Sequence, residues 1–208
     1  MDPNWAAENL QVIRTLMERS AIYRRALAPI MLLLGILGLL SGFLGWTLQI
    51  ASSRGFVLYW MGISLVGITG AYFMVRRQSL RENEPFWSPP TRRVTQALLP
   101  ALVVGCVTGF LIMFPEEKHA PLLWLLPPLW MALYGCAIHA AGFFMQRGIR
   151  LFGWLFIAAS CLLFLQLAQS AVVPPLVQAH LLMGGAFGGF HLAYGIYLYF
   201  TEPRKNEA

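Results

Sequence analysis

Long apolar stretches without formal charge alternate with short charged segments along this chain. The uncharged windows are 26–53, 55–75, 94–115, 119–146 and 151–201. A helix needs about 20 apolar residues to cross the hydrocarbon core of a bilayer. The first four windows each suit one such helix, and the last, with 51 residues, is too long for one and suits two. The pattern therefore predicts membrane-spanning helices.

The last window has a natural break at its middle. A polar cluster, Gln166–Ser170, is followed by Pro174 and Pro175, which cannot donate backbone hydrogen bonds. The predicted fold class is an all-α integral membrane protein, a six-transmembrane-helix bundle in a single domain, 26–201, with a tail, 202–208. The spans are expected near 27–49, 56–75, 95–114, 121–146, 150–170 and 176–200.

The basic residues predict the orientation of this bundle. With six spans both termini share a side, and 13 of the 15 Lys and Arg residues then fall on that side. The opposite side has only Arg54 and Lys118. Lys and Arg accumulate in cytoplasmic loops. We therefore expect a cell-membrane protein, of the inner membrane in a bacterial cell, with both termini in the cytoplasm.

Residues 1–25 precede the first apolar window and have the pattern of an amphipathic helix. Leu10, Ile13 and Met17 recur at helical spacing on one face, and Arg14 and Glu18 lie on another. Such a helix can lie in the plane of the lipid headgroups. The alternative is that it docks on the cytoplasmic part of a partner.

Composition narrows the class further. Hydrophobic residues make up 58% of the chain, charged residues 12%, and the mean hydropathy is +0.62. A soluble domain has about 25% charged residues. These values exclude a soluble globule, a disordered chain and a nucleic-acid-binding domain, and they make the lipid bilayer the first expected partner.

The sequence contains no motif that is typical of a particular enzymatic reaction. All nine Asp and Glu residues fall in predicted tails or loops, and neither an HExxH nor a Walker A pattern is present. We therefore favour a non-enzymatic subunit, scaffold or sensor that binds lipid, a second copy of itself or another membrane protein. A passive permease and an enzyme acting on lipid are the alternatives.

Glycines in the last predicted span indicate close helix packing. Gly184, Gly185, Gly188 and Gly189 form two overlapping GxxxG spacings. Small residues at this spacing let helices approach closely in lipid. They predict packing within the bundle, with contact between two copies as the alternative.

One hypothesis assigns a cofactor to this protein: two histidines would be the ligands of a haem b in an electron-transfer subunit. His139 and His191 lie at depths that differ by only about 3 Å at 1.5 Å rise per residue. Gly135 and Gly188 lie about one turn before them, where a flat macrocycle could approach the backbone. The alternative is structural: a buried neutral histidine can bond to a backbone carbonyl or to a tyrosine hydroxyl such as that of Tyr134. The favoured prediction is that the protein has no cofactor.

Overall fold

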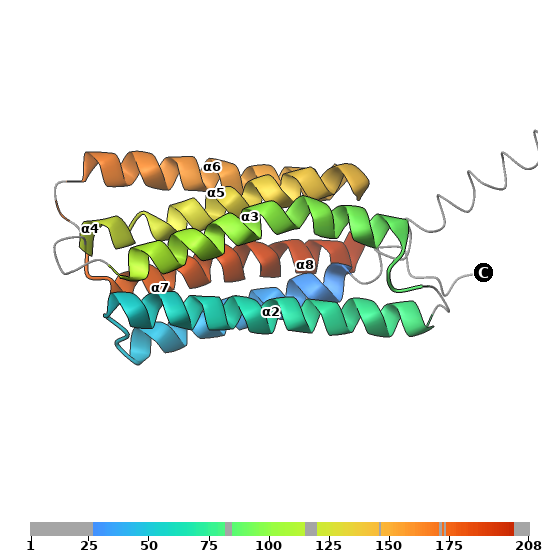
Figure 1. The fold of residues 1–208 in the computed structure, drawn as a ribbon, viewed down its shortest axis with the longest axis horizontal. Helices are drawn as coiled ribbons and strands as arrows, with labels where there is room; N and C mark the ends of the chain where they lie inside the picture. The colour runs from blue at the N-terminus through green and yellow to red at the C-terminus, as the bar shows by residue number, and fades with distance from the viewer. Residues whose placement is uncertain are drawn as a thin grey trace, which may run out of the picture.

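The computed structural model describes residues 27–81, 85–114, 120–145, 147–170, 172 and 174–201. These residues form long helices that lie side by side in a bundle (Figure 1). The helices are an N-terminal helix, Leu27–Thr47, then α2 (Ser53–Arg81), α3 (Pro89–Met113), α4 (Ala120–Leu123), α5 (Leu126–Ala141), α6 (Arg147–Gln169), α7 (Val177–Met183) and α8 (Phe190–Thr201). A 3₁₀ turn, η2 (Gly142–Phe144), follows α5, and a π-helical segment, η3 (Gly184–Gly189), joins α7 to α8. The predicted interfacial helix 1–25 and the tail 202–208 lie outside the described residues.

Five helices are long and apolar enough to cross a membrane, as expected for a helical membrane protein. They are Leu27–Thr47, Ser53–Arg81, Thr91–Met113, Gly148–Gln169 and Val177–Thr201. Each overlaps one of the predicted spans. The second continues beyond the predicted boundary near residue 75 as far as Arg81, so that three arginines lie on its last turns.

The predicted span 121–146 is divided in the structure. A short helix, α4, ends at Leu123, and α5 begins at Leu126 with Pro127 and Pro128 in its first turn. Proline has no backbone N–H, so these two residues cannot donate to the carbonyls of the preceding turn. The 16 residues of α5 alone extend about 24 Å, less than the thickness of the hydrocarbon core.

Two buried apolar clusters follow one another along the bundle. One lies near the start of the N-terminal helix and contains Met31, Met131, Phe152, Phe156 and Leu198, among others. The other lies near the opposite end and contains Phe56, Trp60, Trp124, Leu126 and Met183, among others. We refer to α7, η3 and α8 together, Val177–Thr201, as the last helix. Phe187 packs against both clusters, so the last helix connects them.

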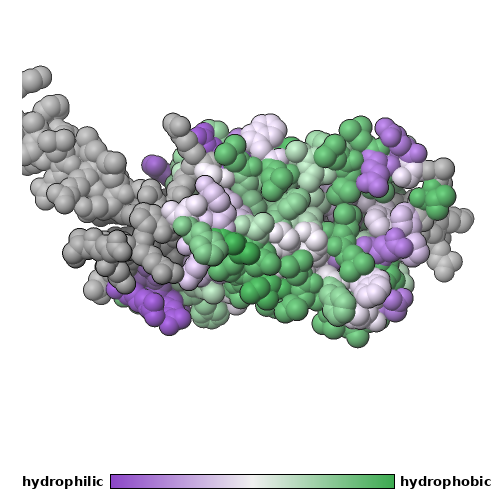
Figure 2. All heavy atoms as spheres, turned by 180° about the vertical axis from the view of Figure 1, so that it is seen from behind, coloured by the Kyte–Doolittle hydropathy of each residue, from purple (hydrophilic) through white to green (hydrophobic). Residues whose placement is uncertain are grey.

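The outer surface of the bundle is mostly apolar. Figure 2 shows hydrophobic residues across the middle of the bundle and hydrophilic residues gathered toward its ends. The helix Thr91–Met113 is the extreme case, with only 6% of its most apolar window buried, against 39% in both the N-terminal helix and the last helix. Such a surface suits contact with lipid tails or with other apolar helices.

The described arginines are divided unequally between the two ends. The beginning of the N-terminal helix, the end of α2, the beginning of α3 and the end of α8 lie at one end of the bundle (Figure 1). That end therefore has Arg76, Arg77 and Arg81 from α2 and Arg92 and Arg93 from α3. Arg54, in the first turn of α2, lies at the other end.

Candidate functional site

His180 on α7 is fully buried and hydrogen-bonded through both ring nitrogens. Its Nδ1 accepts from the indole Nε1 of Trp60 at 3.1 Å, and its Nε2 lies 3.0 Å from the carbonyl oxygen of Ile50. An indole N–H only donates and a carbonyl only accepts, so the ring is the neutral tautomer with its proton on Nε2. Tyr59 packs edge-on against the ring and donates its hydroxyl proton to the carbonyl of Ser41 at 2.7 Å. The imidazole thus joins the last helix to α2 and to the end of the N-terminal helix.

A tight turn after the N-terminal helix presents the Ile50 carbonyl to His180. The helix ends at Thr47, and Gln49 takes a positive φ of 53°, a conformation that few non-glycine residues adopt. The N–H of Ile50 then donates back to the carbonyl of Gly45 at 3.3 Å. Gly45 also leaves room for the imidazole, because a Cβ at this position would overlap the His180 ring. A short sequence motif thus provides both the space and the acceptor for the histidine.

His191 on α8 is buried and makes a second, differently arranged pair of hydrogen bonds. Its Nδ1 donates to the carbonyl of Phe187 at 2.6 Å, and its Nε2 accepts from the hydroxyl of Tyr134 at 2.6 Å. The carbonyl only accepts, so the proton is on Nδ1. The ring is buried among apolar side chains, where a charge is costly, so it is neutral and its Nε2 is the acceptor. Phe152 and Phe156 of α6 surround it, with ring centroids 5.1 and 5.6 Å away. The sequence suggested this arrangement as the alternative to haem binding: a buried neutral histidine bonded to a backbone carbonyl and to the Tyr134 hydroxyl.

His139 lies in a separate environment near the end of α5. Its Nδ1 is 3.3 Å from the carbonyl oxygen of Arg150, a longer contact than those of the other two histidines. Its ring lies edge-on to Phe143 and Trp154, which are both exposed. The side chain thus bonds to the backbone of α6 from a half-buried position.

This geometry does not favour the haem hypothesis for His139 and His191. Both ring nitrogens of His191 are already hydrogen-bonded within the chain. The two glycines that would admit a macrocycle are covered by helices: a Cβ on Gly135 would lie 2.8 Å from the carbonyl oxygen of Gly153, and one on Gly188 would overlap the backbone of Leu39. Among the residues that the structure describes, no three His, Cys, Asp or Glu side chains form a group that could hold a metal ion.

The four glycines of the predicted packing motif have two different environments. A Cβ on Gly184 would lie 2.7 Å from the Cα of Gly42, and Gly188 packs in the same way against Gly38. The N-terminal helix and the last helix therefore meet backbone to backbone. Gly185 and Gly189 lie on another side of the helix, where a Cβ would have no neighbour within 4 Å.

A π-helical turn, η3, contains all four of these glycines and separates the two buried histidines. Its residues are Gly184–Gly189, and His180 and His191 lie in the helical segments on either side. Single π-turns within α-helices are uncommon and frequently accompany functional positions. The sequence pattern did not predict this turn. The extra residue of a π-turn shifts the helix faces by about 100°, but a span with so few polar residues gives no pattern in which that shift is visible.

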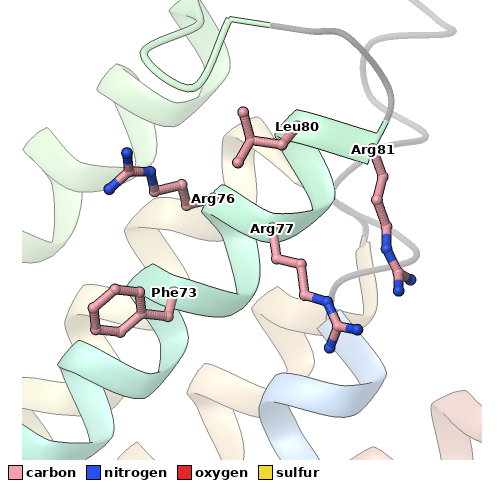
Figure 3. Close-up of a pocket in the computed structure, with 5 residues that line it drawn as sticks. All are labelled: Phe73, Arg76, Arg77, Leu80 and Arg81. Atoms are coloured by element: carbon pink, nitrogen blue, oxygen red, sulfur yellow. The ribbon is translucent and has the colours of Figure 1, made fainter.

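A shallow hollow of about 450 Å³ lies on the last turns of α2. Figure 3 shows its lining: Phe73, Arg76, Arg77, Leu80 and Arg81. The apolar pattern predicts a span that ends near residue 75, so it places the three arginines after the span and does not group them with the two apolar residues. The continuation of α2 to Arg81 brings all five onto the surface of one helix.

Comparison with known proteins gave no match: no protein-family model, no curated protein and no solved structure matches this chain. The fold therefore defines only a broad class of protein: an all-helical protein with helices that are long and apolar enough to span a membrane.

Proposed function

We propose that this chain is a non-enzymatic membrane protein, a subunit, scaffold or sensor that binds lipid or other membrane proteins. In this proposal it crosses the cell membrane six times, with both termini in the cytoplasm. The interior of the bundle is structural, and binding takes place on its outer surface and at its ends.

The observation that most supports this proposal is that the histidines of the apolar helices are hydrogen-bonded within the chain. His139, His180 and His191 lie within the apolar helices, and each is hydrogen-bonded to another group of the same chain. His180 and His191 use both nitrogens in this way. A catalytic base or a metal ligand needs a nitrogen directed at its substrate or metal. These contacts instead stabilise the positions of the helices.

The arrangement of the helix ends supports six crossings rather than five. The N-terminal helix begins at the same end of the bundle at which α8 finishes (Figure 1). An even number of crossings is needed for this, and α4, α5 and η2 together provide the additional one. The basic end would face the cytoplasm, since Lys and Arg accumulate there.

Purification of the full chain in mild detergent, followed by native mass spectrometry, tests the proposal. We expect a defined lipid or protein to remain bound in a fixed ratio through size-exclusion chromatography. An unrelated six-span protein from the same membranes, purified in the same way, identifies general contaminants. A monodisperse monomer that carries neither lipid nor partner would contradict the proposal.

A further inference from the structure

The hollow on the last turns of α2 combines an apolar strip with guanidinium groups on both sides. At about 100° per residue, Phe73 and Leu80 lie within about 20° of each other around the helix. Arg76 falls about 60° to one side of Phe73, and Arg77 and Arg81 fall about 40° and 80° to the other. Figure 3 shows this division, with the side chain of Arg76 extending away from those of Arg77 and Arg81.

We infer that this hollow binds the headgroup of an anionic phospholipid at the cytoplasmic face of the membrane. The inference deepens the proposed function and rests on it, because it names the lipid class and the site. The phosphate would bind between the guanidinium groups, and the upper part of an acyl chain would lie along Phe73.

The arginines of the hollow differ from others in the structure. Three described arginines lie over phenylalanine rings: Arg54 over Phe114 at 6.0 Å, Arg93 over Phe144 at 5.9 Å and Arg150 over Phe143 at 5.2 Å. Within the described ranges, Arg76, Arg77 and Arg81 have no such ring beside them, and all three are exposed. A guanidinium group binds a phosphate through two parallel hydrogen bonds, so these side chains suit a phosphodiester.

The apolar residues of the hollow favour a lipid over a soluble phosphate. Phe73 and Leu80 are 59% and 70% exposed beside the arginines. Along the same side of α2, toward the middle of the bundle, follow Thr69 and then Val66, which is 57% exposed. A soluble anion would leave this strip in contact with water, whereas a lipid would cover it with an acyl chain. Basic sites at the cytoplasmic ends of membrane helices are typical of anionic lipid recognition.

Lipid competition on the purified full chain tests the site. The protein is equilibrated with mixed micelles that contain equal amounts of phosphatidylglycerol and phosphatidylcholine, and native mass spectrometry counts each bound lipid. The test variant is Arg77→Gln/Arg81→Gln, and the matched control is Arg92→Gln/Arg93→Gln. The control removes the same two charges, also from exposed positions at the same end of the bundle. General attraction to anionic lipid would weaken equally in both variants.

We expect the original chain and the control to retain phosphatidylglycerol selectively, and the test variant to retain it at least about tenfold less, as the loss of two charge-assisted bonds implies. An equal loss in both variants, or no loss in either, would overturn the site. Displacement of the lipid by millimolar glycerol phosphate would instead show that the site prefers a soluble phosphate, and it would overturn the lipid assignment. If lipid or partner remains bound but does not depend on Arg77 and Arg81, this inference fails while the proposed function stands. If nothing remains bound to the original chain, the proposed function fails as well.

Discussion

The two buried histidines on the last helix have opposite tautomers, and each tautomer follows from its neighbours. His180 has its proton on Nε2 because Trp60 donates to Nδ1. His191 has its proton on Nδ1 because the Phe187 carbonyl accepts there. A buried polar group that loses its partner costs about 1–3 kcal/mol, so each ring is stabilised in one position and one protonation state by the residues around it.

Tyr134→Phe tests the His191 arrangement. The substitution keeps the ring contacts of Tyr134 with Phe156 and Phe187 but removes the only donor to His191 Nε2 among the described residues. We expect the free energy of unfolding in detergent to fall by about 1–3 kcal/mol, because a buried acceptor is left without a partner. Thermal and denaturant-induced unfolding, followed by circular dichroism, measure the change.

Tyr197→Phe is the matched control. Tyr197 is on the same helix as His191 and is 59% exposed, so removal of its hydroxyl should change stability by no more than about 0.5 kcal/mol. Equal stability of the two variants would show that the Tyr134 hydroxyl does not hold His191.

At the scale of elements, the structure depends on the pairing of the N-terminal helix with the last helix. Gly35, Gly38 and Gly42 meet the backbone of Leu192, Gly188 and Gly184 in turn. In lipid, apolar side chains gain little by leaving the solvent, so helix association depends on close van der Waals contact. A series of glycines provides that contact over several turns.

Gly42→Ala tests this pairing. The added Cβ would lie 2.6 Å from the Cα of Gly184 and 2.8 Å from the carbonyl oxygen of His180, and neither backbone atom can move alone. We expect a loss of about 1–3 kcal/mol in stability, which is typical of overpacking. The measurement is the unfolding midpoint in detergent.

Gly185→Ala is the control, since its Cβ would have no neighbour within 4 Å. Alanine is the better helix former by about 0.5–1 kcal/mol, so this variant should be as stable as the original chain or slightly more stable. A Gly42→Ala protein as stable as the Gly185→Ala protein would contradict the pairing.

The sequence predicted the positions of the helices along the chain better than it predicted which helices and residues contact one another. Apolar windows located five helices that can span a membrane, because length and hydropathy alone set that requirement. Overlapping GxxxG spacings could not show that Gly184 and Gly188 face the N-terminal helix while Gly185 and Gly189 do not, because that depends on the rotation of two helices far apart in sequence. The similar depths of His139 and His191 suggested a common haem site, but depth alone does not show which groups lie beside each ring. His139 bonds to the backbone of α6, and His191 bonds to Tyr134 and to the Phe187 carbonyl. The pairing of Trp60 with His180, 120 residues apart, left no local signal.

The whole molecule is polarised along its axis. At one end, the last turns of α2 and the first turns of α3 have five arginines, whereas Arg54 lies at the opposite end. Arg147 and Arg150 lie in the first turn of α6. The segments that the structure does not describe contain all nine acidic residues and seven of the 15 basic ones, so their contribution to this polarity stays a prediction from the sequence. The six-span count also stays a prediction, and it depends on whether α4, α5 and η2 cross the membrane together.

Cysteine accessibility and a C-terminal reporter test this topology. In a chain whose three cysteines, Cys106, Cys136 and Cys161, are replaced by serine, a single cysteine is introduced as Ala51→Cys, Leu122→Cys or Phe144→Cys, at positions that are exposed on the bundle. If α4 to η2 cross the membrane, a membrane-impermeant maleimide should label the cysteines at 51 and 122 in intact cells, and the one at 144 only after permeabilisation. A cytoplasmic reporter enzyme fused to the C-terminus should be active, and a periplasm-dependent one silent, because an even number of crossings returns the chain to the side of its basic end. Identical labelling at 122 and 144, together with a silent cytoplasmic reporter, would reduce the count to five spans and place the two termini on opposite sides.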